Sequence, residues 1–136
     1  MAILDRFIEN DPFDDLKPVV TAEDIIKAGD ESKKIFVHKC VRQYIVDIVQ
    51  TSRTHSRSLL GASPRSALAL LRASQVYAAI TGSDFVTPDH IKLLCKPVLS
   101  HRILLSGGNN TMKNTEAFIE ELIGSVAAPT EDWEQR

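Results

Sequence analysis

The sequence contains no run of about 18 apolar residues, the length that a membrane-spanning helix requires, so no contact with a membrane is expected. Its first residues, MAILDRFIENDPF, lack the cationic stretch and the long apolar stretch of a secretory signal. Internal repeats and low-complexity tracts are missing as well. What remains is an ordinary globular composition, 43% apolar and 25% charged over 136 residues, long enough for one domain with its own core. We expect a cytoplasmic protein.

Cysteine is scarce, which argues against a disulfide framework. The two cysteines, Cys40 and Cys95, lie far apart inside helical patterns, so buried reduced thiols are the simplest interpretation. The histidines show no i, i+4 pairing with one another or with a cysteine, whereas a zinc site normally takes four clustered ligands. The sequence therefore predicts no metal site.

Acidic residues are scarce in the middle of the chain. Between Lys33 and Ser83 there are eight Lys or Arg residues and a single acid, Asp47, a net charge of +7, while the rest of the chain carries −9. A basic middle in an acidic chain indicates a face that meets an anion, whether a phosphate, a nucleic acid or an acidic partner. Solvated surface explains part of the excess equally well.

Apolar residues spaced three and four apart predict an all-α fold, a small bundle of four to five helices with short extended links. The expected helices cover residues 21–31, 39–54, 64–81, 87 onward with a bend or break at Pro97, and 115–126. Residues 35–37 should be extended and residues 53–63 a loop. The predicted organisation is a linker over 1–20, a helical domain over 21–127 and a flexible tail over 128–136. In the second helix the predicted inward positions are Val41, Tyr44, Ile45, Ile48 and Val49.

The helix over residues 64–81 is apolar almost all round, which predicts a central place in the bundle. Pro64 at its first position, Ser63 before it as N-cap and Gly82 beyond its end are the expected boundary signals. Thr87 followed by a proline opens the next helix in the same way.

Arg65 is out of place in the first turn of this helix. A helix N-terminus carries about half a positive charge, and a cation there costs up to about 1 kcal/mol. If an anion is bound at this end, however, the arginine and the free backbone N–H groups act on the same phosphate. Gly61 and Ala62 would let the backbone approach a bulky ligand closely. An exposed arginine without any ligand is the plain alternative.

Residues 61–105, GASPRSALALLRASQVYAAITGSDFVTPDHIKLLCKPVLSHRILL, resemble the C-terminal lid of the MoxR-type AAA+ ATPases. In that family a Gly-Ala-Ser-Pro-Arg run opens a long Ala/Leu helix, and a Gly-x-Asp-x-Val-Thr-Pro link leads to the next one. A weaker similarity continues upstream through NDPFDDLKPVVTAEDI and YIVDIVQTSR, so that the resemblance covers roughly residues 9–127.

The resemblance implies that Arg65 is the family's second sensor, the lid arginine that reaches the γ-phosphate of ATP and ties the nucleotide state to the position of the lid. Gly61, Ser63 and Pro64 would complete the nucleotide-binding run. The sequence has no G-x-x-x-x-G-K-[ST] loop and no apolar strand ending in paired acids. ATP and Mg are therefore expected only in the parent protein. This chain should bind none and hydrolyse none alone, with residues 1–20 linking it to an ATPase core before residue 1.

The same resemblance implies partners for the chain. These are its own N-terminal ATPase core, neighbouring subunits of a hexameric ring and client proteins, among them proteins with metal-ion-dependent adhesion-type domains, on which the parent would act as a chaperone. The family has a Leu-Asp-Arg-Phe near the end of its core, where the arginine is a candidate finger. In ILDRF the spacing from Phe7 to Pro12 is too short for that role, so Arg6 is not assigned as a finger.

Two other functions fit the sequence in part. One is a DNA-binding helix-turn-helix over residues 64–81 and 88–95, but the link is longer than usual and PDHIKLLCK has no Arg, Asn or Gln to read bases, which speaks against nucleic acid. The other is a protein-interaction module in which Arg53, His55 and Arg57 of a basic loop contact an acidic partner, with a solvated loop as the plain alternative. Arg72 shares a helix face with Arg65 and is interpreted as a surface residue.

Overall fold

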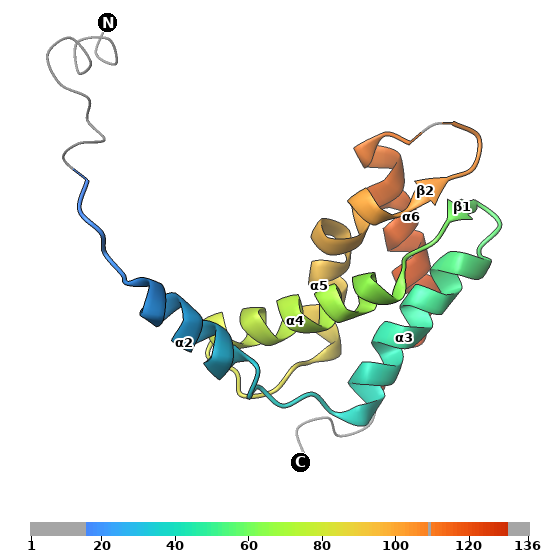
Figure 1. Cartoon of the computed structure of the whole chain (residues 1–136). Helices are drawn as coiled ribbons and strands as arrows, with labels where there is room; N and C mark the ends of the chain where they lie inside the picture. The colour runs from blue at the N-terminus through green and yellow to red at the C-terminus, as the bar shows by residue number, and fades with distance from the viewer. Residues whose placement is uncertain (1–15, 109, 131–136) are drawn as a thin grey trace, which may run out of the picture. The chain divides into compact units, whose positions relative to one another are not determined.

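The computed structural model describes residues 16–108 and 110–130, which divide into a unit ending at Asp30 and a unit beginning at Glu31. Arg6 and most of the predicted linker and tail lie outside the described residues. In chain order the elements, shown in Figure 1, are α2 (Ala22–Ser32), α3 (Lys39–Thr54), β1 (Ser58–Leu60), α4 (Pro64–Ile80), α5 (Pro88–Leu99), the 3-10 helix η1 (Ser100–Arg102), β2 (Leu104–Leu105) and α6 (Met112–Ser125). The predicted all-α class is confirmed.

Helix α2 begins at a capping box formed by Thr21 and Asp24. The hydroxyl of Thr21 accepts a hydrogen bond from the Asp24 N–H at 3.1 Å, and the Asp24 carboxylate accepts one from the Thr21 N–H at 2.9 Å. Hydrogen bonds from Thr21 lower the pKa of Asp24 below its usual value. Ile25 and Ile26 remain 65% exposed on this helix.

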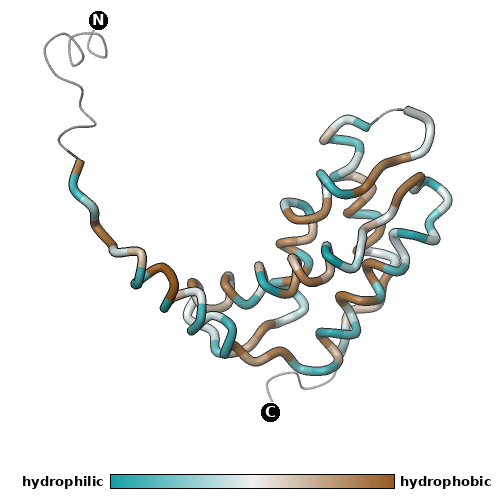
Figure 2. The backbone as a smooth tube through the Cα atoms, viewed as in Figure 1, coloured by the Kyte–Doolittle hydropathy of each residue, from teal (hydrophilic) through white to brown (hydrophobic). Residues whose placement is uncertain are grey.

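The core of the second unit lies between α3, α4, α5 and α6. All five inward positions predicted for α3 are buried, and Figure 2 shows apolar and polar residues alternating along this helix. In each of these helices apolar residues recur three and four positions apart, so they lie on one face, and that face packs into the core. The other buried apolar residues of these helices are Leu70 and Ala78 of α4, Ile91, Cys95 and Leu99 of α5, and Phe118, Ile119 and Leu122 of α6.

Helix α4 is central in its contacts but exposed along one face. It packs against α5 and α3, yet Leu68, Val76 and Ile80 are 62%, 42% and 79% exposed. At 100° per residue these three positions share a face with Arg65 and Arg72. We call this face, Arg65, Leu68, Arg72, Val76 and Ile80, the α4 stripe. The predicted central place of α4 agrees with its packing against α3 and α5, while the α4 stripe is its exposed side.

Part of the predicted loop over residues 53–63 is strand β1. It pairs antiparallel with β2, with Ser58 opposite Leu105 and Leu60 opposite Leu104. The outer edge of β2 is closed by Asn110, whose side-chain oxygen accepts from the Leu105 N–H at 2.6 Å and whose side-chain nitrogen donates to the Leu105 carbonyl at 3.4 Å. An amide side chain thus takes the place of a third strand.

Two helix boundaries differ from prediction. Pro97 lies inside α5, which continues to Leu99, so the predicted break did not occur. The proline sits in the last turn, where only one backbone hydrogen bond is lost and the buried Cys95 and Leu99 still hold the helix against the core. Helix α6 begins at Met112 rather than near residue 115, because the Thr111 hydroxyl caps it by accepting from the Asn114 N–H at 3.3 Å.

Candidate functional site

The N-terminus of α4 is closed by a capping box. The Ser63 hydroxyl accepts from the Ser66 N–H, and the Ser66 hydroxyl accepts from the Ser63 N–H, both at 3.3 Å, which confirms Ser63 as the N-cap. Pro64 has no N–H. Among the described residues, the Arg65 N–H is therefore the one donor of this turn left without an acceptor. The sequence predicts several backbone N–H groups free to bind an anion at this helix start, whereas the part of the chain that the structure describes leaves only that of Arg65.

Arg65 occupies the second position of α4 and is exposed. No hydrogen bond or ion pair within residues 16–108 and 110–130 engages its guanidinium. Ser63 and Pro64 beside it are exposed as well, whereas Ser66 is 1% exposed and fixes the start of the helix from the inside. The side chain of Arg65 and its own N–H are thus both available to an anion from outside this domain.

The segment leading into α4 is held on the last turns of α3. The Ala62 N–H donates to the Ser52 hydroxyl at 3.0 Å, and that hydroxyl donates to the Val49 carbonyl at 2.7 Å. Arg53 donates from Nε to the Ala62 carbonyl at 2.7 Å. These bonds tie both polar groups of the buried Ala62 backbone to α3 and so fix where α4 begins. Arg53, predicted as a partner contact, therefore has an internal structural role.

Position 61 lies so close to the backbone of α3 that it has no room for a side chain. A Cβ at this position would stand 2.6 Å from the Arg53 Cα and 2.6 Å from the Ser52 carbonyl oxygen, closer than real contacts allow. Ala62 next to it is fully buried. The structure thus gives these two residues a different purpose from the predicted approach to a bulky ligand: they let the chain lie against α3.

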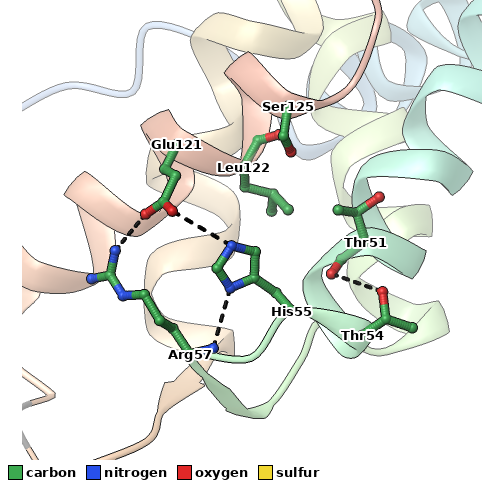
Figure 3. Close-up of polar contacts among 7 residues, drawn as sticks. All are labelled: Thr51, Thr54, His55, Arg57, Glu121, Leu122 and Ser125. Atoms are coloured by element: carbon green, nitrogen blue, oxygen red, sulfur yellow. Dashed lines mark hydrogen bonds and ion pairs between the residues drawn. The ribbon is translucent and has the colours of Figure 1, made fainter.

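His55 and Arg57, the other residues predicted for partner contact, are engaged with α6 (Figure 3). The Arg57 guanidinium forms an ion pair with the Glu121 carboxylate. His55 Nδ1 accepts from the Arg57 N–H at 3.2 Å, which leaves the ring proton on Nε2, 3.6 Å from a Glu121 oxygen. The His55 ring packs edge-on against Phe118 with centroids 4.9 Å apart. These contacts hold the connection before β1 on α6.

Three of the remaining basic residues, Lys34, Arg42 and Arg72, line one shallow hollow beside residues 35–37. Arg72 donates to the Gln75 side-chain oxygen at 2.9 Å, and Gln75 in turn donates to the carbonyls of Ile35 and Lys33 at 3.0 and 3.2 Å. Lys34 pairs with Glu31 at 2.7 Å. The excess of positive charge in the sequence is thus distributed over several local contacts, and Arg65 stands apart from them.

Within the described part of the chain, no group of three His, Cys, Asp or Glu side chains lies close enough to hold a metal ion. Nor does any helix there have the length and the apolar character needed to cross a membrane.

Residues 50–122 match the AAA lid domain family, and the chain belongs to that family. Within it, the chain is a lid domain of the MoxR type. It is 27% identical over 123 residues to the chaperone MoxR1 of Mycobacterium tuberculosis, an alignment that covers 83% of this chain and 33% of that protein.

Two further comparisons agree. The chain is 35% identical over 121 residues to the uncharacterized protein YeaC of Bacillus subtilis, covering 88% of this chain and 38% of YeaC. A crystal structure of a candidate ATPase from Cytophaga hutchinsonii superposes with a TM-score of 0.74 at 25% identity, covering 84% of this chain and 38% of that one. The chain therefore spans little more than a third of the length of the proteins that it matches.

Sequence reasoning missed the residues that position the site. Ser52 and Ser66 were not predicted to act, although the spacing Ser63-x-x-Ser66 resembles a capping box and carried the signal. No local sequence pattern around Glu121 points to its contact with Arg57, which is 64 residues away in the chain.

Proposed function

We propose that this chain senses ATP for a MoxR-type AAA+ ATPase, with Arg65 contacting the γ-phosphate of a nucleotide held by the ATPase core of its own or a neighbouring subunit. The observation that carries this proposal is an exposed guanidinium without an internal partner, at a helix N-terminus whose position is fixed by buried contacts. ATP with Mg supplies the reacting phosphates when bound, and the residues of this chain that would meet it are Arg65, Ser63 and Pro64.

The fixed joint between α3 and α4 explains how such a contact would act at a distance. Because Ala62 is tied to Ser52 and Arg53, a pull on Arg65 is transmitted to α3 and through it to the core of the domain. Loss of one phosphate would remove a charge-assisted hydrogen bond, the stronger class of such bonds, and release the lid. The nucleotide state would thereby set the lid position.

The proposal extends to the assembly, and the short span of the chain relative to its relatives is consistent with a separate ATPase core. The α4 stripe would meet the ATPase core, and neighbouring subunits would complete a hexameric ring in the cytoplasm. The whole machine would remodel client proteins as a chaperone, including clients with metal-ion-dependent adhesion-type domains. The name of the MoxR1 relative supports the chaperone part of this proposal.

A helix-turn-helix function gains no support from the described surface. If α5 were the recognition helix, its exposed positions would have to read bases, and these are Asp89, Leu93 and Pro97. None of these side chains makes the bidentate base contacts of Arg, Asn or Gln. The partly exposed Lys92 and Lys96 are held in ion pairs with Asp89 and Glu120.

The sensor proposal is tested by Arg65→Ala in the full-length protein that contains the ATPase core. We expect the turnover of ATP to fall at least about tenfold, because a charge-stabilising arginine would be lost from the transition state. Arg65→Lys should recover only part of the activity, since a single ammonium cannot reproduce the planar fork. The measurement is steady-state hydrolysis together with nucleotide affinity.

Arg42→Ala is the matched control. Arg42 is also exposed and has no ion pair among the described residues, but it belongs to α3 and not to the start of α4. Its removal should leave turnover unchanged. Equal turnover and equal nucleotide affinity for Arg65→Ala and the unchanged protein would refute the sensor role.

A further inference from the structure

A shallow hollow of about 380 Å³ lies beside residues 35–37, between this segment and the helices α3 and α4. Its three basic side chains come from three parts of the chain: Lys34 before the segment, Arg42 on α3 and Arg72 on α4. None of the described residues that line it is acidic, and the others are Ile35, Phe36, Val37, Leu71 and Gln75. We call this site the basic hollow. Its charge favours an anionic ligand.

The three cations keep most of their charge free for such a ligand. The Arg42 guanidinium engages no residue in the described part of the chain, and Arg72 donates to the neutral amide of Gln75 at 2.9 Å. Lys34 pairs with Glu31 at 2.7 Å, but 70% and 58% of their side chains are exposed. Water screens a pair of this kind, so Lys34 can exchange it for another acid at little cost. The basic hollow therefore presents a net positive charge to solvent.

The floor of the basic hollow is apolar. Ile35, Val37 and Leu71 are half-buried and pack against the core of the domain, whereas the three basic residues are exposed around them. A ligand that fills the basic hollow therefore needs apolar groups as well as negative charge.

A short stretch of unpaired backbone borders the basic hollow. Phe36 turns its N–H to the Asp84 carbonyl and its carbonyl to the Val86 N–H, both at 2.9 Å. In an extended segment the neighbouring residues turn their polar groups the other way, and the Ile35 carbonyl accepts from Gln75 of α4 at 3.0 Å. Val37 belongs to this second side, and its N–H and C=O have no hydrogen bond to a described residue.

We propose that the basic hollow binds an extended acidic segment of a partner protein. The backbone of that segment pairs with the N–H and C=O of Val37, as an added strand does at the edge of a sheet. Because side chains alternate along an extended chain, one set lies on the apolar floor while the carboxylates of the other set reach the three cations. The floor and the free backbone favour a peptide over a nucleic acid, which meets a basic site mainly through its phosphates. This inference goes beyond the ATP sensor and does not depend on it.

The test is the binding of fluorescein-labelled peptides to the 136-residue chain, measured by fluorescence anisotropy without nucleotide. A peptide of alternating glutamate and valine should bind with a Kd below about 1 mM, whereas one of alternating lysine and valine should not bind. Methylation of the backbone nitrogens of the Glu-Val peptide should weaken binding at least about tenfold, because the hydrogen bonds to Val37 are lost.

Three results would overturn the proposal. They are no binding of the Glu-Val peptide at about 1 mM, equal binding of its methylated form, and equally tight binding of a labelled single-stranded oligonucleotide. The last result would assign the basic hollow to nucleic acid.

Charge reversal locates the site. Arg42→Glu and Arg72→Glu should each weaken binding of the Glu-Val peptide at least about tenfold. Lys113→Glu makes the same kind of change at an exposed position of α6 and should alter binding by less than about twofold. Thermal melts followed by circular dichroism verify that each variant is folded. Equal losses in all three variants would mean that net charge alone attracts the peptide and would refute the assignment to the basic hollow.

The sensor and the basic hollow fail separately. Arg65→Ala should lower ATP turnover in the full-length protein but leave peptide binding to the 136-residue chain unchanged. The ATP assay contains no peptide, so Arg42→Ala remains the control of that assay although it should weaken peptide binding. Loss of peptide binding in Arg65→Ala with none in Arg42→Ala would place the peptide at the start of α4 and not in the basic hollow.

Discussion

Residues of one type can have opposite roles a few positions apart, as the arginines around the start of α4 do. Arg53 and Arg65 both belong to the basic middle of the chain, and the sequence treats them alike. Arg53 donates to the Ala62 carbonyl and holds the joint to α3, whereas Arg65 points to no acceptor among the described residues. The difference lies in the fold, because the partner of Arg53 is a backbone group brought to it by a turn.

Gly61 gives a prediction at this joint. Gly61→Ala should destabilise the domain by about 1–3 kcal/mol, since its Cβ would meet the backbone of Arg53 and Ser52 at 2.6 Å and the two segments would have to separate. Gly124→Ala in α6 is the matched control: it meets nothing within 4 Å and should leave stability unchanged or raise it by up to about 1 kcal/mol. Urea unfolding followed by circular dichroism measures both, and equal midpoints for Gly61→Ala and the parent would contradict the packing argument.

Helix starts are the elements that the sequence predicts best. Ser63 and Thr87 each precede a proline, and both are N-caps with reciprocal capping boxes. Such signals are local, within four residues of each other. The pairing of β1 with β2 and the contact of Arg57 with Glu121 join segments far apart in the chain, so no local pattern reveals them. The start of α6 was missed although Thr111 carries a cap signal, because no proline follows it.

The cap of α5 gives a prediction for the dependence of stability on pH. His90 accepts from the Thr87 N–H through Nδ1 and packs edge-on against Tyr77, and desolvation lowers its pKa below the usual 6.5. The unfolded chain therefore binds a proton more readily than the folded one. The stability that His90 contributes is present above pH 6.5 and is lost as the pH falls below it.

His90→Gln should flatten that loss, because glutamine preserves the capping box and does not titrate. The measurement is the difference in unfolding free energy between the parent and the variant at pH 7 and pH 5. The other histidines contribute equally to both proteins and cancel in this difference. Parallel curves for the two proteins would show that His90 is not the group responsible.

At the scale of the whole molecule, the unusual surface is the α4 stripe. Leu68 and Ile80 are more than 60% exposed on a helix whose opposite side is buried, and the chain covers little more than a third of its relatives. A surface of this kind is expected where another part of the protein packs. The sequence shows these residues as apolar but not as exposed, because the pattern of α4 is apolar on both sides.

The substitutions Leu68→Lys and Ile80→Lys test whether the α4 stripe matters for the stability of this domain or for its contact with the rest of the protein. In the isolated chain each should change the unfolding free energy by no more than about 0.5 kcal/mol, since neither side chain is in the core. In the full-length protein the same changes should lower ATP turnover if the stripe makes the proposed contact with the ATPase core. Leu93→Lys, at a 55% exposed position of α5, is the control and should lower neither quantity. Normal turnover with both stripe variants would remove the stripe from the core contact.

The amide of Asn110 has a consequence for how two copies of this chain could meet. The unpaired backbone N–H and C=O groups of an edge strand can pair with a strand of any second chain, and the sheet then extends across the two molecules. The Asn110 side chain already binds the N–H and the C=O of Leu105, so these two groups of β2 are not available to a strand of a neighbouring molecule. Two copies of the chain that meet at this edge are therefore not expected to join their sheets by strand pairing.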